Sequence, residues 1–273
     1  MGESDRVSVD GGSIHVEVEG EGPPLLLIHG GLGDHRMWDL QVPAFAERYR
    51  VIRYDTRGFG RTETDDVVYI DATDAIAVLD HVGATSAYLI GQSRGGSIAL
   101  DVVVEHPERV DAFVSVAGGV SGFEAEVVDG PPADEMERLY EAHDLDALAE
   151  LETRVWVDGW GQPSTRVDPD VRRLVHGWIE ADLKADKPWG KPGTIDPPAA
   201  QRLGDVDVPV LVMIGEVDEA GSVARGRYLA ASVPGARLET FPNVAHMIQL
   251  EEPERFAQLV LAFLGEVDRA NGR

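Results

Sequence analysis

The chain has 273 residues, enough for one large globular domain or for a core with a modest insertion. Hydrophobic residues make up 43% of it, charged residues 27% and cysteine none, which excludes disordered and fibrous proteins, disulfide scaffolds, thiol nucleophiles and thiolate metal sites. With 49 acidic against 24 basic residues the formal net charge is −25, so the surface would repel nucleic acids and anionic membranes, and we expect neither as a partner.

The chain begins with the acidic segment MGESDRVSVD, which lacks the apolar stretch of a secretory signal. The longest purely apolar run covers residues 259–264, far short of the roughly 20 residues that cross a bilayer. We therefore expect a cytoplasmic protein.

The first predicted elements are strands. Residues 7–18 alternate apolar and polar side chains around an Asp-Gly-Gly turn, which predicts a hairpin. Residues 24–28 are apolar throughout, as in a parallel strand that is buried on both faces, and residues 51–54 form another short strand.

Helices then alternate with strands. Apolar residues recur at helical spacing over 71–82, and a second helix ends near residue 104, between strands over 87–90 and 112–116. This order predicts an α/β fold with a mostly parallel central sheet flanked by helices.

The alternation stops after the sixth strand, and the segment that follows has apolar residues at helical spacing. Within it, Asp168 followed by Pro169 is typical of a helix start. We predict an α/β core over 1–118 and 208–273, and an all-helical cap, or lid, inserted over 119–207. The rest of the core is expected to contain two strands and a closing helix, over 208–214, 238–241 and 253–264.

Residues 91–95 read Gly-Gln-Ser-Arg-Gly, a G-x-S-x-G pattern between a predicted strand and a predicted helix. In that context Ser93 sits on a tight turn with strained backbone, and the flanking glycines remove side chains that would clash. The start of the helix offers free N–H groups that suit a developing oxyanion. We interpret Ser93 as a nucleophile.

A nucleophilic serine needs a base, and the base needs an acid that orients it. Asp218 and His246 each follow a predicted strand, so both lie where sites form in α/β sheets, outside the carboxyl ends of the strands. Glu216 and Glu219 could also supply the carboxylate, but the spacing from Gly215 favours Asp218.

The order of these motifs resembles that of the α/β-hydrolases with a Ser-His-Asp triad, including esterases and enol-lactonases, along nearly the whole chain. The resemblance is carried by His29-Gly30-Gly31, Asp55-x-Arg57-Gly58-x-Gly60, Gly91 to Gly95, Gly215-x-x-Asp218, and His246 followed by Glu251-x-Pro253-x-x-Phe256. It implies Ser93 as nucleophile, His246 as general base and acid, and Asp218 as the orienting acid. It also implies an oxyanion hole made by the backbone N–H groups of Gly31 and Arg94.

Other polar residues receive structural interpretations. His29 is expected to shape the oxyanion turn through hydrogen bonds, and Arg57 to hold its own turn. Surface or packing roles are expected for the remaining histidines, His15, His35, His81, His106, His143 and His176. No two histidines and a carboxylate have metal-ligand spacing, so we expect no metal, and no cofactor.

Substrate contacts are less defined by the sequence. Trp156 and Trp160 could line an acyl or aromatic pocket, although such a pair also packs within a cap. Arg94 could bind a substrate carboxylate or form an ion pair with a carboxylate of the cap.

A serine at this turn argues against epoxide opening and dehalogenation, for which proteins that resemble this fold use an aspartate. We expect a serine hydrolase that cleaves a small carboxylic ester or lactone through an acyl-enzyme. The alternatives are a C–C bond hydrolase or a cofactor-free perhydrolase with the same triad, or a non-catalytic receptor for a small ligand. The oligomeric state stays open.

Overall fold

The computed structural model describes residues 3–125, 130–185 and 187–272. Within them the main sheet has nine strands, β1 (Glu3–Val9), β2 (Gly12–Glu19), β3 (Pro24–Ile28), β4 (Arg50–Tyr54), β5 (Glu63–Thr64), β7 (Ala87–Gln92), β8 (Val110–Val116), β10 (Val210–Gly215) and β11 (Arg237–Phe241). Their order is β1-β2-β4-β3-β7-β8-β10-β11, and β5 pairs with β2. The β1–β2 and β2–β4 pairs are antiparallel, and every pair from β4 to β11 is parallel. The predicted α/β fold with a mostly parallel central sheet is confirmed.

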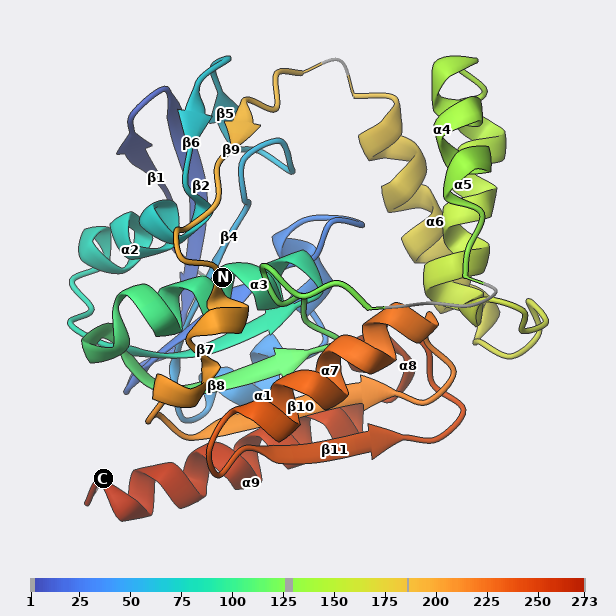
Figure 1. Cartoon of the computed structure of the whole chain (residues 1–273). Helices are drawn as coiled ribbons and strands as arrows, with labels where there is room; N and C mark the ends of the chain where they lie inside the picture. The colour runs from blue at the N-terminus through green and yellow to red at the C-terminus, as the bar shows by residue number, and fades with distance from the viewer. Residues whose placement is uncertain (1–2, 126–129, 186, 273) are drawn as a thin grey trace.

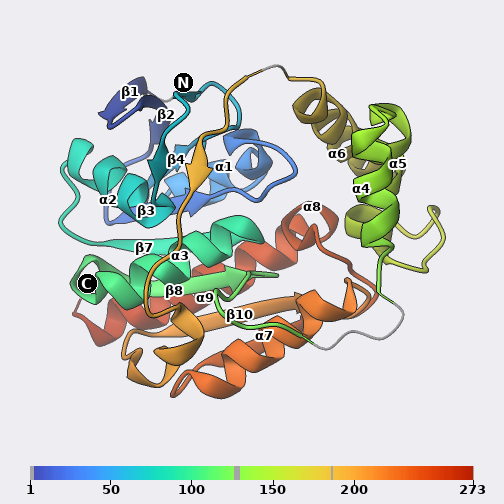
Figure 2. The same cartoon turned by 45° about the horizontal axis from the view of Figure 1, so that its top comes forward.

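Helices cover both faces of the sheet, as Figure 1 and Figure 2 show. One face packs against α2 (Asp71–His81), α3 (Arg94–Glu105) and α7 (Ala220–Ser232), and the other against α1 (Val42–Ala46) and α9 (Pro253–Ala270). In β3, Leu26 and Ile28 join the first cluster and Leu25 and Leu27 the second, since successive residues of a strand point to opposite faces. This strand is apolar throughout because both of its faces are buried.

A helical segment lies between β8 and β10. It contains α4 (Ala133–Glu141), α5 (Leu145–Thr153), the π-helix η3 (Arg154–Gly159) and α6 (Pro169–Leu183). α4, α5 and α6 lie side by side, apart from the helices that cover the sheet (Figure 1). α6 begins at Pro169, where the Asp168 side chain accepts a hydrogen bond from the backbone N–H of Asp170, so the predicted helix start is confirmed.

The segment predicted as an all-helical cap also contains a strand, so that part of the prediction is wrong. β9 (Lys191–Pro192) pairs in parallel with β6 (Val68–Tyr69), and the N–H of Gly193 donates to the carbonyl of Tyr69 at 2.7 Å. Prolines and glycines between residues 188 and 193 disfavour a helix there, and Lys191–Pro192 pairs with β6 instead.

The end of the same segment packs with the sheet. Ile195, Ala199, Leu203 and Val206 are buried in the cluster that contains α2 and α3. Two short 3-10 helices, η4 (Ala199–Gln201) and η5 (Leu203–Asp205), lie here. The division between core and cap at residue 207 stays a prediction, but these residues pack with the core.

Three further short helices complete the described elements, η1 (His35–Trp38), η2 (Pro107–Arg109) and α8 (Ile248–Glu251). Among the described residues, none of the helices combines the length and apolarity that crossing a bilayer requires.

Candidate active site

Ser93 occupies the turn between β7 and α3 with a strained backbone. Its φ is 51° and its ψ −115°, a conformation that residues with a side chain rarely adopt. The turn is held by hydrogen bonds: the N–H of Ser93 donates to Val116 at 2.9 Å, and its carbonyl accepts from Gly96 and Gly119. The surrounding sheet therefore maintains the strain and presents the hydroxyl at the end of β7.

The two glycines of the motif are required by close backbone contacts. A Cβ at Gly91 would lie 2.2 Å from the carbonyl oxygen of Gly95, and a Cβ at Gly95 would lie 2.2 Å from that of Ile28. Both distances are far below van der Waals contact, so the turn tolerates no side chain at either position.

His246 and Asp218 form a buried pair. His246 Nδ1 and Asp218 Oδ2 are 2.7 Å apart, and the two side chains are only 3% and 1% exposed. The other oxygen of Asp218 accepts from the N–H of Glu219 at 2.7 Å. Because Asp218 holds the proton on Nδ1, the Nε2 atom of His246 is left as an acceptor.

The two alternative carboxylates are placed elsewhere. The Glu219 carboxylate caps α7 by accepting from the N–H groups of Gly221 at 2.7 Å and Ser222 at 2.9 Å. Glu216 is exposed. Of the three acidic residues after β10, Asp218 is the one that contacts the imidazole.

Ser93 and His246 line one cavity of about 290 Å³. Trp156 lines it too, with its ring centroid 4.8 Å from that of His246. Trp160 does not reach this cavity; it packs near α4 and α5 and lies 5.9 Å from the Arg154 guanidinium. Trp160 follows the end of the π-helix with ψ 124°, so the helical spacing that paired it with Trp156 does not hold.

The structure places the two predicted oxyanion donors in different surroundings. Arg94 is the first residue of α3, and its side chain lines the cavity at Ser93. Gly31 follows Gly30, whose backbone lies so close to the turn that a Cβ there would be 3.2 Å from that of Ser93. Gly31 itself lines a second cavity, of about 200 Å³.

His29 holds the turn that carries Gly31. Its Nδ1–H donates to the carbonyl of Gly30 at 2.6 Å, and its Nε2 accepts from the N–H of Thr56 at 2.9 Å. Burial lowers the pKa of His29 to about 4, so the ring is neutral and suited to this arrangement.

Two carboxyl groups of the helical segment line the second cavity. Burial raises the pKa of Asp182 to about 6, and burial together with the charge of Asp182 raises the pKa of Glu152 to about 7. Near neutral pH these groups therefore carry less negative charge than exposed carboxylates. The sequence offered no signal for this pair, since the two residues belong to different helices.

Arg94 pairs with the core. Its Nη2 lies 2.9 Å from each oxygen of Asp71, and its Nη1 donates to Thr56 Oγ1 at 2.6 Å. Asp71 is the first residue of α2, so of the two alternatives for Arg94, the ion pair with a carboxylate of the cap is wrong. The sequence could not single out this partner, because it depends on how α2 packs beside α3.

Arg166 joins the helical segment to the loop that carries His246, and no sequence motif pointed to this residue. It lies between η3 and α6, with 3% of its side chain exposed, and pairs with the buried carboxylate of Glu251. It also donates to the carbonyl of Asn243 at 2.7 Å. Glu251 in turn accepts from the N–H of Ala245, beside His246, at 2.9 Å.

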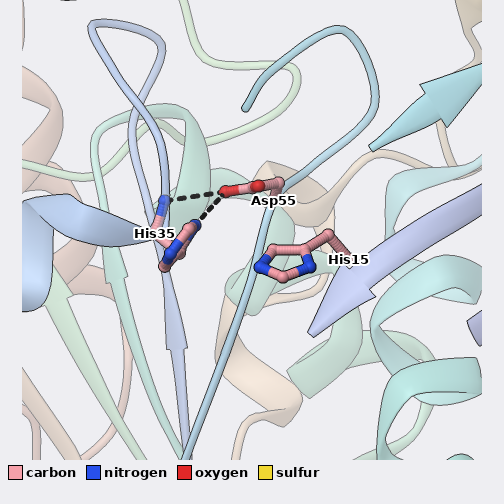
Figure 3. Close-up of side chains that lie close together, drawn as sticks. All are labelled: His15, His35 and Asp55. Atoms are coloured by element: carbon pink, nitrogen blue, oxygen red, sulfur yellow. Dashed lines mark hydrogen bonds and ion pairs between the residues drawn. The ribbon is translucent and has the colours of Figure 1, made fainter. Parts of the chain in front are cut away.

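His15, His35 and Asp55 form a buried cluster, shown in Figure 3, whose candidate ligand atoms lie within 4.8 Å of one another. Sequence spacing missed it because the residues come from β2, η1 and the end of β4. His35 Nδ1 and Asp55 Oδ1 are 2.6 Å apart, whereas two ligands of a tetrahedral zinc ion would be separated by about 3.3 Å. The distance fits a shared proton better than a metal.

The charges around His35 support the same interpretation. Its Nε2 lies 3.2 Å from Glu17 Oε1, so the ring lies between two carboxylates. Burial opposes protonation, but the hydrogen bond that His35 donates to Asp55 and the charges of Asp55 and Glu17 outweigh it and raise the pKa of His35. A protonated His35 supplies the positive charge that a metal would otherwise bring. We interpret the cluster as a structural link.

Comparison with known proteins gives consistent matches. The profile of the family described as alpha/beta hydrolase fold matches residues 23–253. A 2-hydroxymuconate semialdehyde hydrolase from Pseudomonas sp. (strain CF600) is 32% identical over 270 residues, covering 92% of this chain and 90% of the relative. 3-Oxoadipate enol-lactonase 1 from Acinetobacter baylyi (strain ATCC 33305 / BD413 / ADP1) is 25% identical, covering 94% and 95%. The crystal structure of carboxylesterase CesB (YbfK) from Bacillus subtilis is 27% identical, with a TM-score of 0.72, covering 97% and 92%.

Proposed function

Because this chain belongs to the alpha/beta hydrolase fold family, we propose that it is a serine hydrolase that cleaves a small carboxylic ester or lactone through an acyl-enzyme. The observation that carries the proposal is the 2.7 Å contact between His246 and Asp218 at a cavity that Ser93 also lines. A carboxylesterase and an enol-lactonase among the relatives support the same reaction class.

In the proposed mechanism, His246 acts first as a base. Asp218 keeps the proton on Nδ1, so Nε2 accepts the proton of Ser93 while its Oγ attacks the substrate carbonyl. The negative charge on the carbonyl oxygen is stabilised by the N–H groups of Arg94 and Gly31.

The tetrahedral intermediate then collapses as the C–O bond to the leaving group breaks. His246 returns its proton to the leaving alkoxide, and Ser93 holds the acyl group as an ester. A water molecule, deprotonated by His246, attacks this ester and releases the carboxylic acid and free Ser93. No cofactor takes part in the proposed reaction.

Cleavage of a C–C bond is a second candidate, because the 32% identical relative is a 2-hydroxymuconate semialdehyde hydrolase. In that case the same residues would act on a ketone, and a carbanion would leave in place of an alkoxide. Turnover of a vinylogous diketone compared with turnover of esters and lactones separates the two.

The test is a series of p-nitrophenyl esters from acetate to decanoate, together with a lactone and a vinylogous diketone. We expect the wild type to cleave the short esters or the lactone, and Ser93→Ala to lose at least about a thousandfold in kcat. Ser164→Ala, at an exposed serine, is the matched control.

Three other outcomes would contradict or change the proposed reaction. Retained turnover in Ser93→Ala would refute the serine mechanism. Faster turnover of the diketone than of any ester would favour the C–C hydrolase. Stoichiometric release of product without turnover would indicate a receptor.

A further inference from the structure

The charged side chains that line the cavity at Ser93 are basic, whereas the chain as a whole is acidic. Its charged lining residues, among those that the structure describes, are Arg94 and Arg225, and no carboxylate lines it. The chain as a whole has 49 acidic and 24 basic residues. The arginines lie on α3 and α7, which pack on the same face of the sheet (Figure 1 and Figure 2). The charged side chains that line this cavity are therefore basic.

The two arginines differ in how many of their hydrogen-bond donors already have partners within the protein. Both oxygens of Asp71 lie 2.9 Å from Arg94, and Thr56 accepts a further hydrogen bond from it. Both contacts with Asp71 come from Nη2, and the carboxylate balances the charge of the guanidinium. Arg94 is therefore held by Asp71 and Thr56, although 26% of its side chain is exposed.

Arg225 keeps unused donors. In the described part of the chain it donates one hydrogen bond, from Nη2 to Ser222 Oγ at 2.9 Å. Its ion pair with Glu219 is longer, at 3.5 Å, and both oxygens of Glu219 already accept backbone N–H groups at the start of α7. A guanidinium has five N–H donors, and 29% of the Arg225 side chain is exposed. It can therefore bind another anion.

We propose that Arg225 binds a carboxylate of the substrate, so that the enzyme prefers small esters or lactones that carry a second, ionised carboxyl group. This inference rests on the proposed function. A guanidinium binds a carboxylate through two parallel hydrogen bonds, and within a partly enclosed cavity such charge-assisted bonds are strong. The cavity volume of about 290 Å³ is enough for a small carboxylate to reach Arg225.

Two esters of equal chain length test the proposal. Mono-p-nitrophenyl glutarate carries a carboxylate where p-nitrophenyl valerate carries a methyl group. We expect Arg225→Gln to lower the ratio of kcat/KM for the glutarate to that for the valerate by about tenfold to a hundredfold. Arg227→Gln, at an exposed position of the same helix, should leave the ratio unchanged.

Equal losses on both esters in Arg225→Gln would overturn the proposal, because they would show only a role in holding α7. Arg225→Lys keeps the charge without the planar fork, so it should retain part of the preference for the glutarate. Its activity also shows that the chain still folds with a substitution at this position. An unchanged ratio in all three variants would also overturn it.

A binding measurement separates this proposal from the proposed function. Glutarate is titrated into Ser93→Ala and into the double variant with Arg225→Gln, using calorimetry. Saturable binding that weakens at least about tenfold in the double variant supports the carboxylate site even if the wild type cleaves neither ester. Absence of glutarate binding to Ser93→Ala, with ester turnover intact in the wild type, would refute the carboxylate site alone.

Discussion

Asp218 and Glu219 are adjacent in the sequence and both are buried, but they accept hydrogen bonds from different partners. Asp218 pairs with the ring of His246, whereas Glu219 accepts the N–H groups of Gly221 and Ser222. At the scale of single residues, one carboxylate serves the proposed reaction and its neighbour stabilises a helix.

This difference can be measured. Asp218→Asn should lower kcat by on the order of 10³- to 10⁴-fold with little change in Tm, because an amide that donates to Nδ1 leaves Nε2 of His246 protonated. Glu219→Gln should instead lower the free energy of unfolding by about 1 kcal/mol with a smaller loss of kcat, since it weakens a cap. Ester turnover and thermal unfolding of both variants check this. A larger loss of turnover in Glu219→Gln would assign the acid to Glu219.

At the scale of elements, His35 links three parts of the fold. It lies on η1, between Asp55 at the end of β4 and Glu17 on β2. Its raised pKa means that the folded chain binds this proton more tightly than the unfolded chain. The stabilisation is therefore complete below about pH 6.5 and is lost as the pH rises through the pKa of the folded state.

We expect His35→Gln to lower the free energy of unfolding more at pH 5.5 than at pH 8.5. Glutamine can keep one hydrogen bond but cannot carry the charge. Urea unfolding at both pH values measures the difference, and His143→Gln, at an exposed histidine, is the control. A destabilisation that is equal at both pH values would mean that His35 acts by packing alone.

The sequence predicted elements and residues whose signal is local. The strands at β3, β7 and β8, the start of α6 and the turn at Ser93 depend on short patterns, and the structure shows each of them. α7 has no such pattern: it packs through small residues, and a Cβ at Gly226 would lie 2.2 Å from Ile214 Cγ2.

Contacts between distant segments could not be predicted. Arg166 with Glu251, Arg94 with Asp71, and the cluster around His35 each join residues that are far apart or in separate elements. A single sequence shows that acidic and basic residues are present, but it does not show which of them pair, because the packing of the elements brings the partners together. The strand β9 was not predicted for the same reason, because its hydrogen bonds are made with β6, which is distant in the sequence.

At the scale of the whole molecule, the net charge of −25 opposes the compact state, because like charges repel more when they are close. Salt screens exposed charges beyond about 10 Å at 0.1 M. The chain should therefore be more stable at higher ionic strength.

We expect Tm at pH 8 to rise by several degrees, roughly 2–5 °C, between 0.05 M and 0.5 M NaCl. The rise should shrink near pH 4.5, the isoelectric point, where little net charge remains to be screened. Calorimetry at both pH values tests this. A rise of equal size near the isoelectric point would point to a salt effect unrelated to net charge.

The contact of Arg166 with Glu251 and Asn243 limits how the helical segment could be exchanged in an engineered chimera. Exchange of a helical segment between related proteins treats that segment as an independent module. Here a graft that replaced the α4–α6 segment without an equivalent of Arg166 would leave the Glu251 carboxylate buried without its cation, beside the loop that carries His246. A functional chimera would need to carry both Arg166 and Glu251. The unit to exchange would therefore be the helical segment together with the loop that carries His246.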